Sequence, residues 1–227
     1  MRSICAFFFI VFFLISLTLG LSAQSTDVLA AARDSYWKVQ NGSAMHPLII
    51  LDAGHGGTDE GTKVSALKEK RLTLLTVLMT KKKLEELGYR VMLTRGRDIF
   101  LSLPKRVSIA NRTKATLFVS VHYNSAPSPD ANGIEIFYFD SKEIWRSRAS
   151  KRLAQCLLHR MIDQTEAASR GVKTSNFHVI RETDMPAVLI EAGFITNYKE
   201  RQKLKDREYI ERIAVGIAQG IDKYMKT

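Results

Sequence analysis

The stretch Leu48-Ile-Ile-Leu-Asp-Ala-Gly-His-Gly-Gly57 decides the fold of this chain. An apolar run between Pro47 and a group of glycines is typical of a strand that is covered on both faces of an α/β sheet. Sites in such sheets lie beyond the carboxyl ends of the strands. The flanking glycines permit a sharp turn, so the sequence predicts that His55 is presented there as a candidate metal ligand.

The same arrangement recurs twice further along the chain. Leu117–Asn124 is an apolar run that ends near His122, and the run after Pro186 leads into Glu191 and a polar loop. An isolated histidine is more often structural or solvated than a ligand. Polar residues near the ends of separate strands are more informative, because the sheet can bring them together.

Strands and helices alternate through most of the sequence. The spacing of apolar residues and the positions of glycine and proline predict helices at 69–87, 103–115, 144–162 and 209–224. They predict strands at 48–51, 89–94, 117–124, 134–139 and 177–180, and one before Glu191, with a polar loop at 58–65. This order predicts a single α/β domain with a largely parallel or mixed twisted sheet and helices on both faces.

The first 45 residues differ in character from the rest. Residues 1–23 combine a basic start with an apolar run and resemble a secretory signal, with an uncleaved membrane anchor as the alternative. Residues 24–45 are polar and are interpreted as a linker, which leaves 46–227 as the folded domain. Because Cys5 lies in the leader, Cys156 remains alone and no intramolecular disulfide can form.

The formal net charge of +11 favours polyanionic partners. No nucleic-acid-binding motif is present, so nucleic acid is not expected as a partner. An exported chain would instead meet anionic lipid or an acidic cell-wall polymer. The leader therefore predicts a periplasmic or cell-envelope location, with membrane contact only through the leader if it is uncleaved.

Five ordered motifs resemble the zinc-dependent N-acetylmuramoyl-L-alanine amidases, and more narrowly the amidase 3 family. The resemblance runs from Leu48 to the C-terminus and rests on Asp52–Gly57, Glu69-Lys70, the segment from Gly88-Tyr89 to Thr94-Arg95, Val119–Asn124 and Pro186–Phe194. Residues 46–227 would then be a zinc amidase catalytic domain. The sequence departs from the commonest form of the family motif at Ala53, a position where proline often occurs.

The resemblance implies one zinc ion per chain, held by His55, Glu69 and His122, with Glu191 as the catalytic carboxylate. Two imidazoles and one carboxylate leave zinc a position for water, as hydrolytic sites require. Zinc-activated water would cleave the amide between N-acetylmuramic acid and L-alanine, with Glu191 as general base and then general acid.

Each assignment has a simpler alternative. Glu69 could be a first-turn residue favoured by the helix dipole, and His122 could be a core histidine. Glu191 is harder to explain structurally, because an unpaired buried carboxylate is costly. Glu135 is a second candidate acid, although its alternation with isoleucines equally fits an outward-facing strand residue.

Two further residues are predicted to bind substrate. Asn124 follows the His122 strand, and Arg181 could pair with a stem-peptide carboxylate, although a surface salt bridge is its alternative. Regulated relatives carry an extra helix that plugs the zinc site. The span Ser141–Arg170 has room for one helix and its flanks, so the sequence predicts an uncovered cleft.

Three functions compete: a zinc amidase of peptidoglycan, a zinc peptidase that acts on stem peptides, and a non-catalytic wall-binding module. A binding module does not need an open hydrolytic site, which favours the enzymes. Peptidoglycan is the expected partner, and an envelope recruitment or activator protein stays open, as does the oligomeric state. A dinucleotide loop is excluded, because Gly54-His55-Gly56 continues to Asp59 where a third glycine is required.

Overall fold

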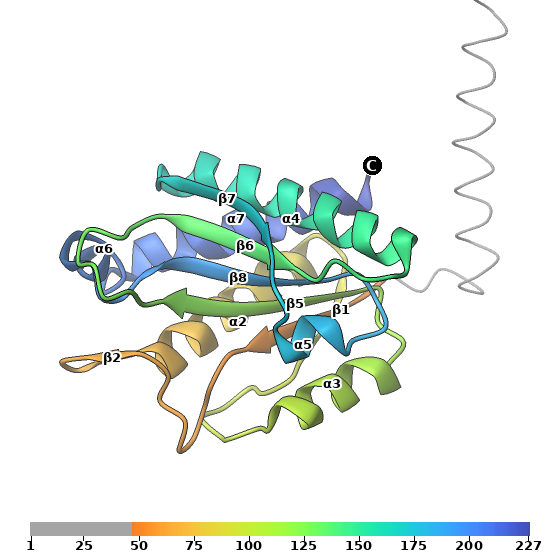
Figure 1. Ribbon diagram of the computed structural model, residues 1–227, viewed down its shortest axis with the longest axis horizontal. Coiled ribbons are helices and arrows are strands. Elements are labelled where there is room, and N and C mark those ends of the chain that lie inside the picture. The colour runs from red at the N-terminus through yellow and green to blue at the C-terminus, as the bar shows by residue number, and fades with distance from the viewer. Residues whose placement is uncertain (1–46) are drawn as a thin grey trace, which may run out of the picture. The chain divides into compact units, whose positions relative to one another are not determined.

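A computed structural model describes residues 47–227, and its centre is a six-stranded sheet with strand order β4-β1-β5-β8-β6-β7 (Figure 1). Neighbouring strands run parallel except β6 and β8, which are antiparallel. The strands are β1 (Leu48–Ala53), β4 (Arg90–Leu93), β5 (Leu117–Asn124), β6 (Ile134–Tyr138), β7 (Ser169–Thr174) and β8 (Ala187–Phe194). A separate hairpin joins β2 (Lys63–Val64) to β3 (Leu67–Lys68).

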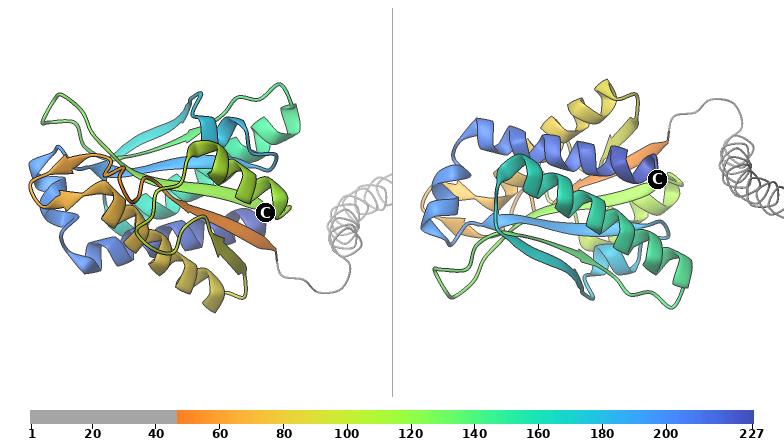
Figure 2. Two further views of the ribbon diagram at one scale, coloured as in Figure 1. Left: turned by 90° about the horizontal axis from the view of Figure 1, so that it is seen from below. Right: turned by 90° about the horizontal axis from the view of Figure 1, so that it is seen from above.

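Helices cover both faces of this sheet. Helices α2, α4 and α7 pack together on one face, and α3 and α5 lie on the other (Figure 2). The helices are α2 (Glu69–Glu86), α3 (Leu103–Arg112), α4 (Ile144–Thr165), α5 (His178–Arg181), α6 (Tyr198–Lys203) and α7 (Arg207–Met225). Buried isoleucines at positions 210, 213, 217 and 221 give α7 its apolar face.

Burial on both faces explains the apolar strand sequences. The apolar residues of β1 from Ile49 to Leu51 are fully buried, as are Leu117–Val119 of β5. Each strand therefore contributes to a hydrophobic cluster on either side of the sheet. Because β1, β5 and β8 are mutually parallel neighbours, their carboxyl ends meet at one edge.

The predicted fold class is confirmed: the domain is α/β, its sheet is mixed but mostly parallel, and helices flank both faces. The strand predicted at Phe177–Ile180 is wrong. Residues 178–181 form helix α5, in which Arg181 N–H donates to Phe177 C=O. A short apolar run does not distinguish one helical turn from a strand.

The sequence prediction also missed short elements. Strand β2 lies in the loop predicted at 58–65 and β3 follows it, whereas β7 and α6 had no predicted counterpart. The span Ser141–Arg170 holds helix α4, which packs on α7 and β6. Within residues 47–227, we find no helix that is both long and apolar enough to cross a bilayer. The predicted leader and linker lie outside the described residues.

Candidate metal site and catalytic carboxylate

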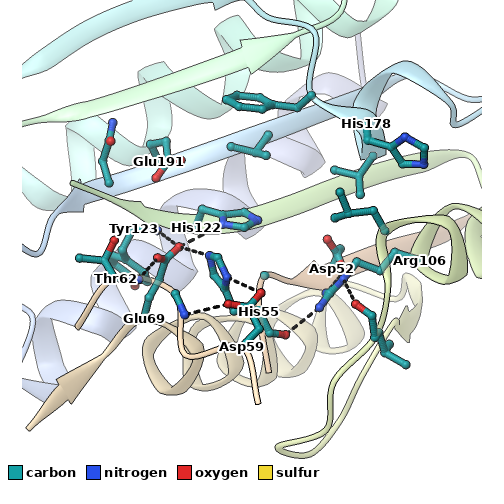
Figure 3. A pocket seen from close by; sticks show the side chains of 18 of the residues that line it. Asp52, His55, Asp59, Thr62, Glu69, Arg106, His122, Tyr123, His178 and Glu191 are labelled. Carbon is teal, nitrogen blue, oxygen red and sulfur yellow. Dashed lines mark hydrogen bonds and ion pairs between the residues drawn. The ribbon is translucent and has the colours of Figure 1, made fainter. Parts of the chain in front are cut away.

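Three side chains converge where β1 and β5 end and α2 begins. Glu69 Oε1 lies 3.0 Å from His55 Nε2 and 3.0 Å from His122 Nδ1. One donor atom from each residue lies within 4.8 Å of the others, which makes the group a possible metal site (Figure 3). Glu69 opens α2 and is 3% exposed, so the helix start places its carboxylate under both imidazoles.

Neighbouring groups fix the orientation of these donors. Asp59 Oδ2 lies 2.8 Å from His55 Nδ1, and because an ionised carboxylate can only accept, Nδ1 carries the proton and Nε2 faces Glu69. Glu69 also accepts hydrogen bonds from the backbone N–H groups of Thr62 and Tyr123. Despite burial, which acts in the opposite direction, the two histidines hold the pKa of the Glu69 carboxyl far below its usual value.

Two buried arginines hold the turn that carries His55. Arg106 donates to the carbonyl oxygens of Ala53 and His55, at 2.6 and 2.7 Å, and Arg95 donates to those of Ala53 and Gly54, at 3.0 and 2.8 Å. His55 itself has a φ of 59°, a conformation uncommon for a residue other than glycine. The two guanidinium groups therefore stabilise a strained turn at the metal site.

The charge of Arg106 is balanced by Asp52 on β1. Their side chains are 3% and 1% exposed and lie 2.7 Å apart. Burial alone would raise the pKa of the Asp52 carboxyl, but Arg106 and the hydroxyl groups of Thr94 and Ser120 outweigh that effect and lower it. The network ties β1, β5 and α3 to Thr94, the residue after β4, beneath the turn.

Space beside the metal donors is limited. Gly54 lies against the His122 ring, and a Cβ at this position would overlap the imidazole. Glycine at position 54 is therefore required by close packing against His122, a candidate metal donor.

Glu191 lies beside the donor group on the adjacent strand. Strand register places it opposite His122 of β5 and opposite Glu135 of β6. Its Oε2 is inaccessible to solvent and finds no hydrogen-bond partner among residues 47–227. Burial, together with the charges of Glu69 and Glu135, raises the pKa of the Glu191 carboxyl well above its usual value.

Glu135 does not face outward, so the interpretation of this residue as an outward-facing strand position is wrong. It is 5% exposed and shares the sheet face of Glu191. Its carboxylate accepts hydrogen bonds from Asn124, Arg170 and Lys173 at 2.6, 2.9 and 2.5 Å. Although burial opposes it, these partners lower the pKa of Glu135. The two neighbouring carboxyls therefore differ sharply in proton affinity.

A cleft of about 580 Å³ opens over these groups. Its lining includes His55, Glu69, His122 and Glu191, and it extends past Asp52 and Arg106 towards His178 (Figure 3). The cleft is thus lined by the candidate metal donors and by Glu191 together.

The structure places the two predicted substrate-binding residues differently. Asn124 lines the cleft, with its amide bonded to Glu135. Arg181 is not among the lining residues, and its guanidinium contacts Glu182, Asn176 and His178. The sequence interpretation assigned no role to Asp59, Arg95 or Arg106. The position of Asp59 four residues after His55, and that of Arg95 at the end of a family motif, could have suggested one.

Comparison with known proteins agrees with this geometry. Residues 49–223 match the Amidase_3 family, described as N-acetylmuramoyl-L-alanine amidase. The uncharacterised protein YqiI of Bacillus subtilis is 40% identical over 176 residues, which cover 78% of this chain and 84% of YqiI. The matches to the amidases LytC of Bacillus subtilis and CwlM of Bacillus licheniformis are both 36% identical and cover 35% and 66% of those proteins.

Solved structures share both fold and sequence with the domain. The catalytic domain of the amidase CwlV from Bacillus (Paenibacillus) polymyxa var. colistinus has a TM-score of 0.74 and 40% identity, covering 79% of this chain and 98% of that one. The CwlD amidase from Clostridioides difficile, solved in complex with the GerS lipoprotein, has a TM-score of 0.75 and 32% identity, covering 80% and 99%. Because the family match spans the sheet and every donor described above, the chain belongs to the Amidase_3 family of N-acetylmuramoyl-L-alanine amidases.

Proposed function

We propose that this protein is a zinc-dependent hydrolase that cleaves the amide between N-acetylmuramic acid and the L-alanine of peptidoglycan stem peptides. The observation that carries the proposal is the half-buried Glu191, whose Oε2 has no hydrogen-bond partner among residues 47–227, beside the donor group of His55, Glu69 and His122 in one open cleft. Membership of an amidase family supports the choice of bond.

The donor set fits a zinc ion. Tetrahedral ligands about 2.0–2.1 Å from zinc lie roughly 3.3 Å from one another, close to the 3.0 Å between Glu69 Oε1 and each imidazole nitrogen. Asp59 behind His55 supplies the carboxylate partner that metal-ligating histidines commonly have. When bound, zinc would make the amide carbonyl more electrophilic and water more acidic.

Glu191 is suited to proton transfer. A carboxylate of ordinary pKa would be a weak base at neutral pH, whereas burial and neighbouring charges raise the pKa of Glu191. In this proposal its carboxylate takes a proton from the attacking water and returns it to the departing nitrogen of L-alanine. Because Oε2 has no hydrogen-bond partner among residues 47–227 and Glu191 lines the cleft, no protein donor competes for this carboxyl.

Product analysis of digested peptidoglycan tests the proposal. Free stem peptides that begin with L-alanine are expected; shortened stems would indicate a peptidase, and unchanged muropeptides would indicate a binding module. We expect Glu191→Gln to keep zinc and lose turnover, and His55→Ala to lose both. Full activity of Glu191→Gln would remove this residue from the mechanism.

The proposed location is the cell envelope, with residues 1–23 as the export signal and 24–45 as a linker to the catalytic domain. Peptidoglycan is the proposed partner. An activator protein is a further candidate, for which the lipoprotein complex of CwlD is a precedent in a relative. Fractionation of cells tests the location. N-terminal sequencing of the protein before and after export tests whether residues 1–23 are removed.

A further inference from the structure

One half of the cleft is apolar and open to solvent. Among its lining residues, Phe100 is 55% exposed, Leu103 52% and Phe177 39%, and the buried Leu189 lines the cleft beneath them at 4% exposure. Clustered apolar side chains that remain exposed commonly mark a binding surface. We call these four residues the apolar platform.

Strand register places the platform beside Glu191. Leu189 and Glu191 are alternate residues of β8, so they share a sheet face and lie about 7 Å apart along the strand. Leu189 is paired with Phe137 of β6, and the Phe137 ring meets Phe177 edge-on with centroids 5.3 Å apart. Phe177 is thereby held close to Leu189 on the sheet face that also carries Glu191.

Phe100 approaches the site from the other side. The segment that carries it lies directly against the turn after His55, because a Cβ on Gly57 would be 2.5 Å from the Phe100 nitrogen. Gly57 also has a φ of +60°, so a larger residue is disfavoured by conformation as well as by space. The platform therefore has residues on both sides of the cleft, near a metal donor and near Glu191.

The apolar half offers little to an anionic ligand. Arg106 lines it, but this side chain is buried and its charge is balanced by Asp52. The charge of Arg181, next to His178, is paired with Glu182 at 2.5 Å. A neutral ligand with an apolar face fits this half better than a carboxylate does.

On the other side of Glu191, the neighbourhood of its cross-strand partner Glu135 has a surplus of positive charge. Glu135 is paired with both Arg170 and Lys173, whose side chains are 37% and 41% exposed. Two cations share one carboxylate there, which leaves attraction for a second anion. Asn124, which bonds to Glu135, connects this cluster to the cleft wall.

We infer that the apolar platform binds the pyranose ring of muramic acid, and that the stem peptide runs the other way, towards Arg170 and Lys173. This inference rests on the proposed function. In that substrate a lactyl group links the sugar ring to the scissile carbonyl, so the ring must lie next to the metal donors. A pyranose presents apolar C–H faces to Phe100 and Phe177, while its carboxylate-bearing stem is attracted to the cationic end.

The two reaction products test the orientation without turnover. Peptide-free glycan chains and free stem peptides are titrated separately into the zinc-loaded protein. Phe100→Ala is expected to weaken glycan binding about tenfold, as for the loss of one apolar contact face, and to leave stem-peptide binding unchanged. Trp145→Ala is the matched control, because Trp145 is 58% exposed on α4 and does not line the cleft.

A second variant keeps the test valid if Phe100→Ala does not fold. Phe177→Leu keeps an apolar contact with Phe137 and should also weaken glycan binding, by less than Phe100→Ala. If either variant weakens stem-peptide binding and spares glycan binding, the orientation is reversed; if neither changes either affinity, the platform is not a sugar site. Failure of wild-type protein to release stems that begin with L-alanine would refute the proposed function, whereas glycan binding that depends on Phe100 would still support the sugar site.

Discussion

The ion pair between Arg106 and Asp52 is the interaction whose loss we expect to cost the domain most. Both side chains are almost fully buried and lie 2.7 Å apart. Arg106→Ala would leave the Asp52 carboxylate buried without its counter-ion, which typically costs about 3–5 kcal/mol. Domains of this kind have total stabilities of about 5–15 kcal/mol, so the variant should lose at least about a fifth of its stability.

Arg146 provides a matched control for burial. It is 6% exposed, and its guanidinium donates to the carbonyl oxygens of Met185, Ile180 and Arg181, but it forms no ion pair with a buried carboxylate. We expect Arg146→Ala to cost about 1–3 kcal/mol, as for carbonyl groups left unsatisfied. Urea unfolding of the metal-free proteins, followed by circular dichroism, measures both losses.

Zinc affinity separates the two arginines further. Arg106 holds the His55 carbonyl oxygen and Arg146 contacts no part of the metal site. Chelator competition should therefore show weaker zinc binding for Arg106→Lys, which retains a charge near Asp52, and unchanged binding for Arg146→Lys. Equal stability losses for the two alanine variants, together with equal zinc affinities for the two lysine variants, would refute this reasoning.

Three further predictions concern the residues around the donors. Gly54→Ala should abolish zinc binding because its Cβ would overlap a ligand ring, whereas Gly96→Ala, which meets nothing within 4 Å, should not; equilibrium dialysis compares them. Asp59→Ala should weaken zinc binding about 10- to 100-fold, because Asp59 fixes the proton on His55 Nδ1; an unchanged affinity would exclude that role. The pKa of Asp52 is lowered by folding, so its contribution to stability is present above about pH 3.9 and is lost as pH falls further. Acid titration should therefore give Asp52→Asn a lower starting stability and a shallower decline below that pH.

The strands that carry the donors were predictable because burial on both faces leaves a continuous apolar run. The apolar runs at 48–51 and 117–119 are of this kind, and they lie in β1 and β5. Helix α2 was also predictable, because its apolar residues recur at helical spacing and a glycine follows its end. In contrast, β7 is an edge strand with half-exposed residues, so its sequence carries no comparable signal.

The supporting groups of the site were not predictable in the same way. The contacts of Arg95 and Arg106 are with backbone carbonyl oxygens about 40 to 50 positions earlier in the chain, and no local pattern encodes such contacts. The environment of Glu135 was equally hidden, since its partners Arg170 and Lys173 lie on a strand that the sequence did not reveal. Local periodicity therefore identified the strand ends but not the arginines that hold them.

Glu135 and Glu191 are cross-strand neighbours whose carboxyls differ in proton affinity, and the charges around them explain why. They face each other across β6 and β8, so each would raise the pKa of the other if both were unpaired. Arg170 and Lys173 keep Glu135 ionised, and its remaining negative field contributes to the raised pKa of Glu191. The cationic pair thus lowers the pKa of the Glu135 carboxyl, while the pKa of the Glu191 carboxyl stays raised. A raised pKa makes the ionised form of Glu191 a stronger base, which suits the general-base role proposed for it.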